Sequence, residues 1–179
     1  MKKSERTRAA ILSASRQSFS ERGFEATTIR MIAEAARVDP ALVIRYFGNK
    51  DALFAQVIEV DLDLPQDLSG AATVGESLVA RFLDLWEDDT RGLPILLRAA
   101  TTNDVAAEKV RSVFAGQIVP FARRLGPGAG AERRAALVVS QLFGFALCRY
   151  ILRLSPAVAM TREEIIADLA PVLDRHLGR

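Results

Sequence analysis

The stretch Thr28–Lys50, TIRMIAEAARVDPALVIRYFGNK, decides the fold of the first part of this chain. Apolar residues recur at i, i+3, i+4 and i+7 from Ile29, which predicts a helix with one buried face, and Thr28 is placed to cap its N-terminus. Asp39 and Pro40 predict the start of a second helix, because aspartate accepts a free backbone amide and proline lacks an amide that would be unpaired there. We therefore expect two short helices joined by a turn, a helix–turn–helix.

The second of these helices is expected to have one buried and one exposed face. A helix this short has little stability alone, so its exposed side should serve a partner. Basic residues surround it, and a compact helix–turn–helix of this kind suits the DNA major groove. We expect Leu42, Val43 and Phe47 to face inward. The residues expected to face outward are Pro40, Ala41, Arg45 and Tyr46.

Positive charge is concentrated on the same part of the chain. Residues 1–50 hold 10 Lys and Arg against 5 Asp and Glu, whereas residues 51–179 hold 14 against 17. An ordinary solvated basic surface would produce the same count. Together with the helix–turn–helix, however, the distribution favours contacts with DNA phosphates.

The run from Thr7 to Phe54 resembles the N-terminal domain of TetR-family transcriptional regulators. Arg37 departs from the family pattern because glycine usually stands at this turn, so either the arginine tolerates a strained backbone or the turn has a different conformation. Ile44 departs as well, since many members carry an aromatic residue or histidine there and use it to contact a phosphate. The residues that agree with the pattern are Phe19, Gly23, Phe24, Thr28, Ile32, Ala33, Val38, Phe47, Lys50 and Leu53.

The resemblance implies a set of DNA contacts. Thr28 and Lys50 would hold phosphates, and Arg30 would reach a groove edge. Arg45 is the best candidate for a bidentate contact with guanine, because its guanidinium is fork-shaped. The predicted DNA-binding residues are Thr28, Arg30, Arg37, Asp39, Pro40, Ala41, Leu42, Arg45, Tyr46 and Lys50.

The remaining sequence has helical periodicity, and we expect an all-α protein of about nine helices. Residues 1–6 are predicted to form a basic arm, and Pro120 to bend or break a long helix. A DNA-binding domain is expected over residues 1–50 and a helical effector-binding and dimerisation domain over residues 51–179. A single helix from Lys50 to Asp63 is predicted to connect them mechanically.

Two C-terminal helices are predicted to form a dimer interface. The helix Ala131–Leu154 is apolar almost all round and carries small residues every four positions, which allows another helix to approach closely. Burial of this helix inside a monomer is the alternative. The last helix begins at a capping box, Thr161 to Glu164. The predicted interface residues are Ala136, Ser140, Gly144, Cys148, Ile165, Leu169, Val172 and Leu173.

The resemblance implies a homodimeric repressor that a small apolar ligand releases from a palindromic operator. The alternative is a constitutive or architectural DNA-binding protein without an effector, and a solidly filled body would favour it. The same aromatic residues that could line a ligand cavity are also typical of an ordinary core. The predicted ligand-binding residues are Phe82, Trp86, Leu97, Phe114, Gln117, Phe121, Gln141 and Phe145.

An enzyme is disfavoured, and no cofactor or metal is expected. His176 is the only histidine and has no nucleophile motif around it. The acidic run Glu87–Asp89 is expected to be a solvated helix end, and the glycine-rich run 126–130 lacks the ending of a phosphate-binding loop.

The sequence also predicts a cytoplasmic location. The charged N-terminus has no secretory apolar region, and the uncharged segment 135–148, 14 residues long, is shorter than the roughly 20 needed to span a bilayer. Cys148, the only cysteine, lies in this segment, where we expect a buried small side chain, with a redox sensor as the alternative.

Overall fold

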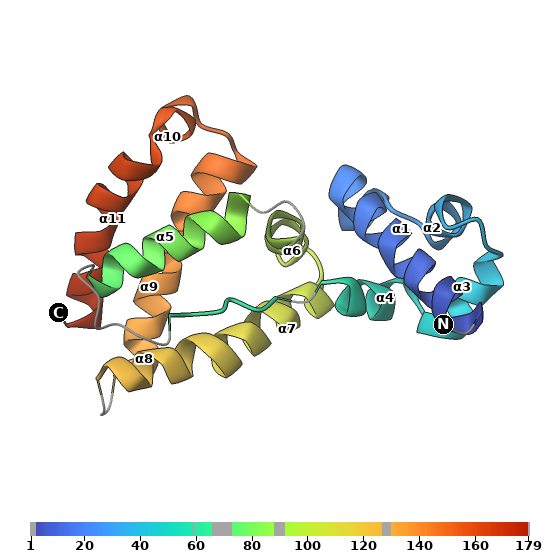
Figure 1. Cartoon of the computed structure of the whole chain (residues 1–179), viewed down its shortest axis with the longest axis horizontal. Helices are drawn as coiled ribbons and strands as arrows, with labels where there is room; N and C mark the ends of the chain where they lie inside the picture. The colour runs from blue at the N-terminus through green and yellow to red at the C-terminus, as the bar shows by residue number, and fades with distance from the viewer. Residues whose placement is uncertain (1–2, 59, 66–72, 88–91, 127–129, 179) are drawn as a thin grey trace. The chain divides into compact units, whose positions relative to one another are not determined.

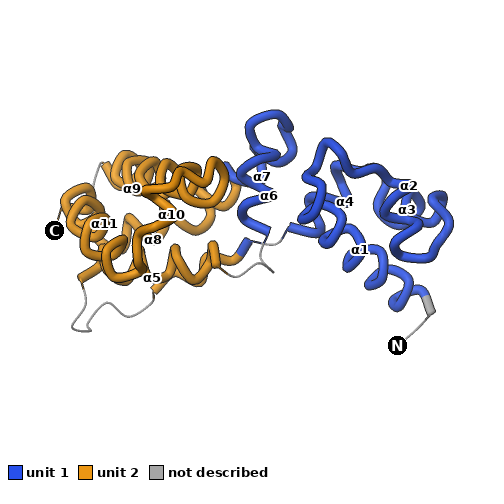
Figure 2. Tube along the Cα trace, turned by 90° about the horizontal axis from the view of Figure 1, so that it is seen from above, with its two compact units in different colours: residues 1–60, 90–111 blue, residues 61–89, 112–179 orange. Residues whose placement is uncertain are grey.

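The computed structural model of the chain describes residues 3–58, 60–65, 73–87, 92–126 and 130–178 (Figure 1). Within these residues all regular structure is helical, as expected from the sequence, and the segments join into ten continuous helices. The chain divides into two compact units, coloured separately in Figure 2. Unit 1 contains residues 1–60 and 90–111, and unit 2 contains residues 61–89 and 112–179.

Unit 1 is built around the predicted helix–turn–helix. Its core is formed by large side chains that are almost fully buried, among them Phe19, Ile32, Val43 and Phe54. Its helices are α1 (Lys3–Ala26), α2 (Ile29–Ala35), α3 (Pro40–Phe47), α4 (Lys50–Val57), α6 (Leu93–Ala99) and α7 (Asp104–Val113), the last of which continues beyond the unit.

The helix boundaries in the helix–turn–helix follow the predicted caps. The Thr28 hydroxyl accepts a hydrogen bond from the Met31 amide at 3.2 Å, and the Asp39 carboxylate accepts one from the Ala41 amide at 2.7 Å. Between the two helices, Arg37 has a φ of 55°, the left-handed conformation that glycine adopts more easily. The expected backbone strain at Arg37 is therefore present.

Two predictions at the edges of unit 1 are wrong. Residues 3–6 belong to α1 instead of forming an arm, while residues 1 and 2 lie outside the described part of the chain. The predicted helix from Lys50 to Asp63 ends at Val57, because Ile58 leaves the helical conformation with φ −95° and ψ 91°.

Helix α4, which follows the domain boundary expected at residue 50, belongs to unit 1. Its apolar residues are buried with those of α1 and α6 in the core of this unit. Residues 90–111 join the same unit. The buried residues of α4 and its C-cap are Leu53, Phe54, Val57 and Ile58.

Unit 2 contains the helices that were expected to bind a ligand and a second copy. Two stretches have π-helical hydrogen bonds, η1 and η2. The first of them precedes Pro120, so the predicted irregularity at this proline takes the form of a wider helical turn. The elements of this unit are α5 (Val74–Glu87), η1 (Phe114–Ile118), α8 (Val119–Leu125), α9 (Ala131–Ala146), η2 (Leu147–Ile151), α10 (Ser155–Ala159) and α11 (Arg162–Leu177).

Helices α5 and α11 approach most closely at Gly75. Its amide donates a hydrogen bond to the Asp174 carboxylate at 2.7 Å. A Cβ added at Gly75 would contact the Ala170 carbonyl oxygen and lie 2.9 Å from the Ala170 carbonyl carbon. Both atoms belong to the backbone of α11, so a side chain at position 75 has no space without moving the helix. The absent side chain of Gly75 therefore sets the distance between the two helices.

Replacement of Gly75 by alanine should destabilise unit 2. We expect Gly75→Ala to lower the free energy of unfolding by about 3 kcal/mol, because overpacking against fixed backbone is not relieved by a rotamer change. Urea denaturation followed by circular dichroism measures this effect. Gly116→Ala is the matched control, since an added Cβ there meets nothing within 4 Å. Equal denaturation midpoints for the two variants would contradict the close approach of α5 and α11.

Candidate functional site

Helix α3 presents an exposed face that no other described part of unit 1 covers. Val43 and Phe47 are buried in the core at 0% and 5% exposure, while Ala41 and Arg45 are exposed on the opposite side. Pro40 is also exposed, at the first position of the helix. The predicted inward and outward faces are therefore present at these positions.

Two residues of α3 have less definite positions than the sequence suggested. Leu42, expected to face inward, is only half-buried. Tyr46, expected to face outward, is half-buried against the core of unit 1, with its ring 6.3 Å from that of Phe47. Tyr46 can therefore offer a DNA partner only part of its ring and its hydroxyl.

The residues that precede α3 surround its N-terminal end with polar groups. Arg30 on α2 is exposed, as are Arg37 in the turn and Asp39 at the cap. Thr28 is exposed too, and its hydroxyl, which accepts the Met31 amide, keeps its own proton free to donate. These positions are compatible with contacts to a DNA backbone.

Lys50 lies at the start of α4 and is held in place by Phe24. Its ammonium donates a hydrogen bond to the Phe24 carbonyl at 2.9 Å and sits 4.1 Å from the centre of the Phe24 ring. An ammonium has three donors, so a phosphate contact remains possible after this bond is made. The contact with Phe24 was not expected from the sequence, and it orients the ammonium before any ligand binds.

In unit 2, part of the predicted ligand site is gathered into an aromatic cluster. Phe82 and Trp86 of α5 have ring centres 5.8 Å apart, and Phe145 of α9 lies 6.4 Å from Phe82. The cluster contains a fourth ring, Tyr150, which stacks on Trp86 at 5.2 Å. The sequence analysis missed Tyr150.

Ordinary helical spacing contains a signal that could have found Tyr150. This residue lies four positions after Ala146, which is fully buried, so the two residues share one side of the helix. In η2 the Leu152 amide donates to the Leu147 carbonyl, five residues earlier, which is the wider turn of a π-helix. The ring that Tyr150 stacks on, Trp86 of α5, is distant in the sequence, so residue order does not show the stacking itself.

The Tyr150 hydroxyl is buried and has no hydrogen-bond partner in the described part of the chain. Burial raises the pKa of this hydroxyl above its ordinary value, and the negative charge of Glu87 acts in the same direction, while Arg149 and Arg162 act against it. Tyr150 therefore stays protonated at neutral pH and retains an unused hydrogen-bond donor.

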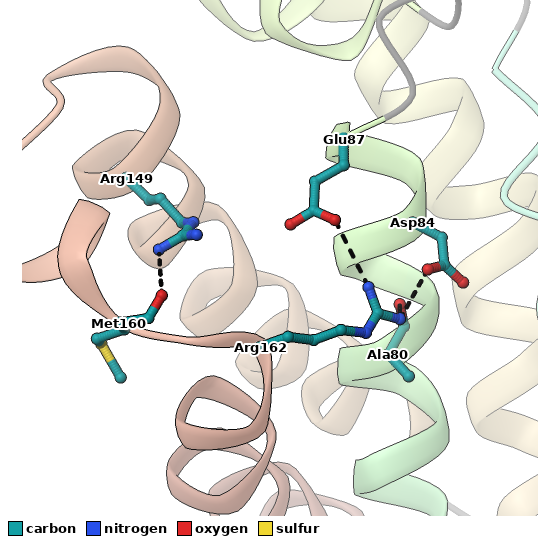
Figure 3. A network of polar contacts seen from close by, with 6 residues as sticks. All are labelled: Ala80, Asp84, Glu87, Arg149, Met160 and Arg162. Carbon is teal, nitrogen blue, oxygen red and sulfur yellow. Dashed lines mark hydrogen bonds and ion pairs between the residues drawn. The ribbon is translucent and has the colours of Figure 1, made fainter.

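Charged side chains lie beside this aromatic cluster. Figure 3 shows Arg162 of α11 beside α5, where it donates to the Asp84 carboxylate at 2.7 Å and lies 3.6 Å from that of Glu87. Arg149 donates to the Met160 carbonyl at 3.1 Å and to two further carbonyls of the preceding turn. These contacts tie η2 and the start of α11 to their neighbours.

The other predicted ligand residues do not join the cluster. Phe114 packs on the contact of α8 with α9, and Phe121 is buried in α8 beneath Arg124. Gln117 accepts the Leu62 amide at 2.8 Å, and Gln141 is exposed. Leu97, the remaining residue, belongs to unit 1.

The small-residue stripe on α9 is accessible. Ala136, Ser140 and Gly144 are exposed, Cys148 is half-buried, and an added Cβ at Gly144 would meet nothing within 4 Å. Leu147, which follows on η2, is 42% exposed. The alternative of burial inside a monomer therefore does not describe this face of the helix.

The predicted interface residues on α11 divide into two groups. Ile165 and Leu173 are fully buried within the chain, so their side chains are not available to a second copy in this conformation. Leu169 and Val172 are half-buried and can still contribute. The periodic apolar pattern of α11 thus serves mainly the contact with α5, which the sequence could not distinguish from a dimer contact.

One helix in the described residues, Ala131–Ile151, is long and apolar enough to cross a membrane. Its most apolar stretch of 18 residues has a mean hydropathy of 1.3, and 17% of this stretch is buried within the chain. It is longer than the segment 135–148 because the helix continues on both sides. A single such helix is weak evidence for membrane insertion. No group of three or more potential metal ligands occurs in the described ranges, and residues 88 and 89 of the acidic run and 127–129 of the glycine-rich run lie outside them.

Two family models match the chain. Residues 11–57 match the model for bacterial regulatory proteins of the tetR family, and residues 72–177 match the tetracyclin repressor-like C-terminal domain.

Individual relatives agree with these matches. The chain is 47% identical over 55 residues to the HTH-type transcriptional repressor Rv3405c of Mycobacterium tuberculosis, an alignment that covers 31% of this chain and 29% of the relative. It is 32% identical over 126 residues to the HTH-type transcriptional repressor SCO4008 of Streptomyces coelicolor, covering 63% and 66% of the two chains.

Solved structures extend the similarity to the whole fold. The TetR-family regulator SCO0857 of Streptomyces coelicolor has a TM-score of 0.65 and 26% identity, over 100% of this chain and 98% of its own. GusR of Salmonella enterica has a TM-score of 0.74 at 22% identity, over 97% and 96% of the two chains, and at this identity it shows the fold alone. Because the C-terminal model alone spans more than half of the chain and the helix–turn–helix has the family's geometry, the chain belongs to the TetR family of bacterial transcriptional regulators.

Proposed function

We propose that this regulator is a homodimeric repressor that binds a palindromic operator through two copies of α3. The observation that carries the proposal is the geometry of the helix–turn–helix. Val43 and Phe47 anchor α3 in the core, and Asp39 caps it, which leaves Ala41 and Arg45 exposed for a DNA groove. Two of the relatives, Rv3405c and SCO4008, are transcriptional repressors, which supports the choice of repression.

Base recognition is assigned to Arg45. Arg45 is exposed on a helix whose other exposed residues are apolar, so it is the residue of α3 best suited to a bidentate contact with guanine. Lys50, Thr28 and Arg30 are assigned to phosphates, which set the position of α3 but carry no sequence information.

Dimerisation is assigned to the exposed stripe of α9. An apolar helix face in water favours association, and small side chains at Ala136, Ser140 and Gly144 permit a second helix to come close. Leu169 and Val172 of α11 extend the proposed interface. Binding of a palindrome requires the two α3 helices of such a dimer to lie about one DNA turn apart, roughly 34–36 Å.

Release by a small apolar ligand is assigned to the aromatic cluster of unit 2. The aromatic cluster of Phe82, Trp86, Phe145 and Tyr150 supports it, because the buried Tyr150 hydroxyl lacks a partner that a ligand could supply. A constitutive DNA-binding protein remains the second candidate. Phe114 and Phe121 favour that candidate, because they pack elsewhere in unit 2 as ordinary core residues and do not join the aromatic cluster.

The roles of Arg45 and Lys50 are separable by experiment. On a palindromic duplex selected from a random library, Arg45→Ala should lose about 1–3 kcal/mol of binding free energy, with little loss on unrelated duplexes. Lys50→Ala should weaken both about equally and reduce the salt dependence by about one counterion per subunit. Fluorescence anisotropy at several salt concentrations measures both effects.

The control for this comparison is Arg98→Ala, which removes an exposed arginine of α6 in the same unit. Circular dichroism of Lys50→Ala checks folding, because the lysine also bonds to Phe24. The same sequence-independent loss in both variants would contradict the division between base and phosphate contacts.

The dimer interface is tested at Gly144. Gly144→Arg should give a monomer in sedimentation equilibrium, since a long charged side chain would stand where two helices meet. Gly116→Arg makes the same change at another exposed glycine and should remain dimeric. A dimeric Gly144→Arg variant at micromolar concentration would place the interface elsewhere.

Ligand release is tested through Trp86, the only tryptophan. Apolar aromatic compounds are titrated against its fluorescence with and without the selected duplex. The compound should lower the affinity of the protein for the duplex, and the duplex should lower its affinity for the compound, by the same factor. Tyr150→Phe keeps the ring and removes the hydroxyl, so it should weaken compounds that carry a hydrogen-bond acceptor. Tight binding that the duplex leaves unchanged would contradict release, and a screen without any binder would support the constitutive candidate.

A further inference from the structure

Ile44 is the large hydrophobic side chain of the helix–turn–helix that the core does not use. It is 53% exposed, although it lies in the middle of α3 between the fully buried Val43 and the exposed Arg45. Among the described residues of unit 1, the other exposed large hydrophobic is Val105 on α7, at 37%. Much of the Ile44 side chain therefore stays in contact with water in unit 1 and is available to a partner.

The neighbours of Ile44 form a single surface. On a helix, residues three and four apart lie side by side, so Ala41 is adjacent both to Ile44 and to Arg45. All three are exposed, and within the described chain no hydrogen bond or ion pair holds the Arg45 guanidinium away from this surface. The exposed face of α3 thus combines an apolar pair with one fork-shaped donor.

In the major groove, an isoleucine side chain can recognise a base only through apolar contact. It has no hydrogen-bond donor, so it cannot hold a phosphate or bond to the polar edge of a base. The major groove offers one apolar group, the C5-methyl of thymine, which apolar side chains recognise. Contact with this methyl would remove both apolar surfaces from water.

We propose that Ile44 is a specificity-determining residue that reads the methyl group of a thymine in each half-site, beside the base read by Arg45. The inference rests on the proposed placement of α3 in the major groove. The inference gives Ile44, for which the sequence analysis expected no DNA contact, a preference for thymine. Ala41 lies on the same side of the helix and widens the apolar surface, but its short side chain reaches less far than that of Ile44.

The first test compares the sequences that three forms of the full chain select from a random duplex library: wild type, Ile44→Ala and Val105→Ala. Wild type should select a symmetric site with one thymine per half-site that Ile44→Ala no longer prefers, while the guanine assigned to Arg45 persists. Val105→Ala removes a comparable exposed side chain from α7 and should select the wild-type site.

The second test removes only the methyl group. In the duplex that wild type selects, deoxyuridine replaces this thymine, which preserves every hydrogen-bonding group. Wild type should lose about fourfold in affinity per half-site, the value expected for one buried methyl group, and Ile44→Ala should lose almost nothing. Because Ile44 is exposed, both proteins should be equally folded, and circular dichroism checks this.

The outcomes separate the inference from the proposal on which it depends. If wild type and Ile44→Ala select the same thymine, or lose equal affinity on the deoxyuridine duplex, Ile44 does not read the methyl and the inference is overturned. If wild type selects no sequence at all, the proposed reading of the groove by α3 fails, and the inference fails with it. Selective loss by wild type alone supports both.

Discussion

The packing of Phe24 is the interaction on which the presentation of α3 depends. Gly23, with a φ of 79°, kinks α1 near its end, and the Phe24 ring then packs against Phe19 at 5.8 Å and Phe54 at 4.7 Å. The Phe24 carbonyl accepts the Lys50 ammonium, which also lies over the ring. One residue thus joins the end of α1 to the start of α4. Helix α3, only eight residues long, lies between them in the sequence and could not keep its orientation alone.

In unit 2 a single continuous helix serves two proposed purposes. One face of α9 and η2 carries Phe145 and Tyr150 toward the aromatic rings of α5, while Ala136, Ser140 and Gly144 remain exposed. The predicted mechanical link through a helix reaching Asp63 does not exist, since α4 ends earlier. If a ligand binds at the aromatic cluster, as proposed, the element it would contact directly is the same helix that is proposed to hold the dimer together.

The two departures from the family pattern have different physical meanings. Arg37 adopts the left-handed backbone conformation of the turn at a cost of roughly 1–2 kcal/mol. The turn therefore keeps its geometry although arginine disfavours this conformation. Ile44 changes the chemistry of the exposed face without changing the fold, because its side chain points away from the core. The first departure affects stability, and the second affects which partner surface α3 can recognise.

The sequence by itself determined the features that depend on neighbouring residues along the chain. The caps at Thr28 and Asp39, the inward side of α3 at Val43 and Phe47, and the capping box that opens α11 are local hydrogen bonds and helical spacings, so residue order is enough to predict them. For the same reason the all-α fold and the small-residue stripe could be predicted without a structure.

Only the tertiary structure decided which side of each apolar helix meets which neighbour. Ile165 and Leu173 have the same spacing whether they face α5 or a second copy, and packing alone buries them within one chain. Tyr150 joins the aromatic cluster by stacking on Trp86 of another helix, and α4 ends at Val57 although apolar residues continue. Each outcome depends on contacts between residues distant in the sequence, and helical periodicity carries no information about such contacts.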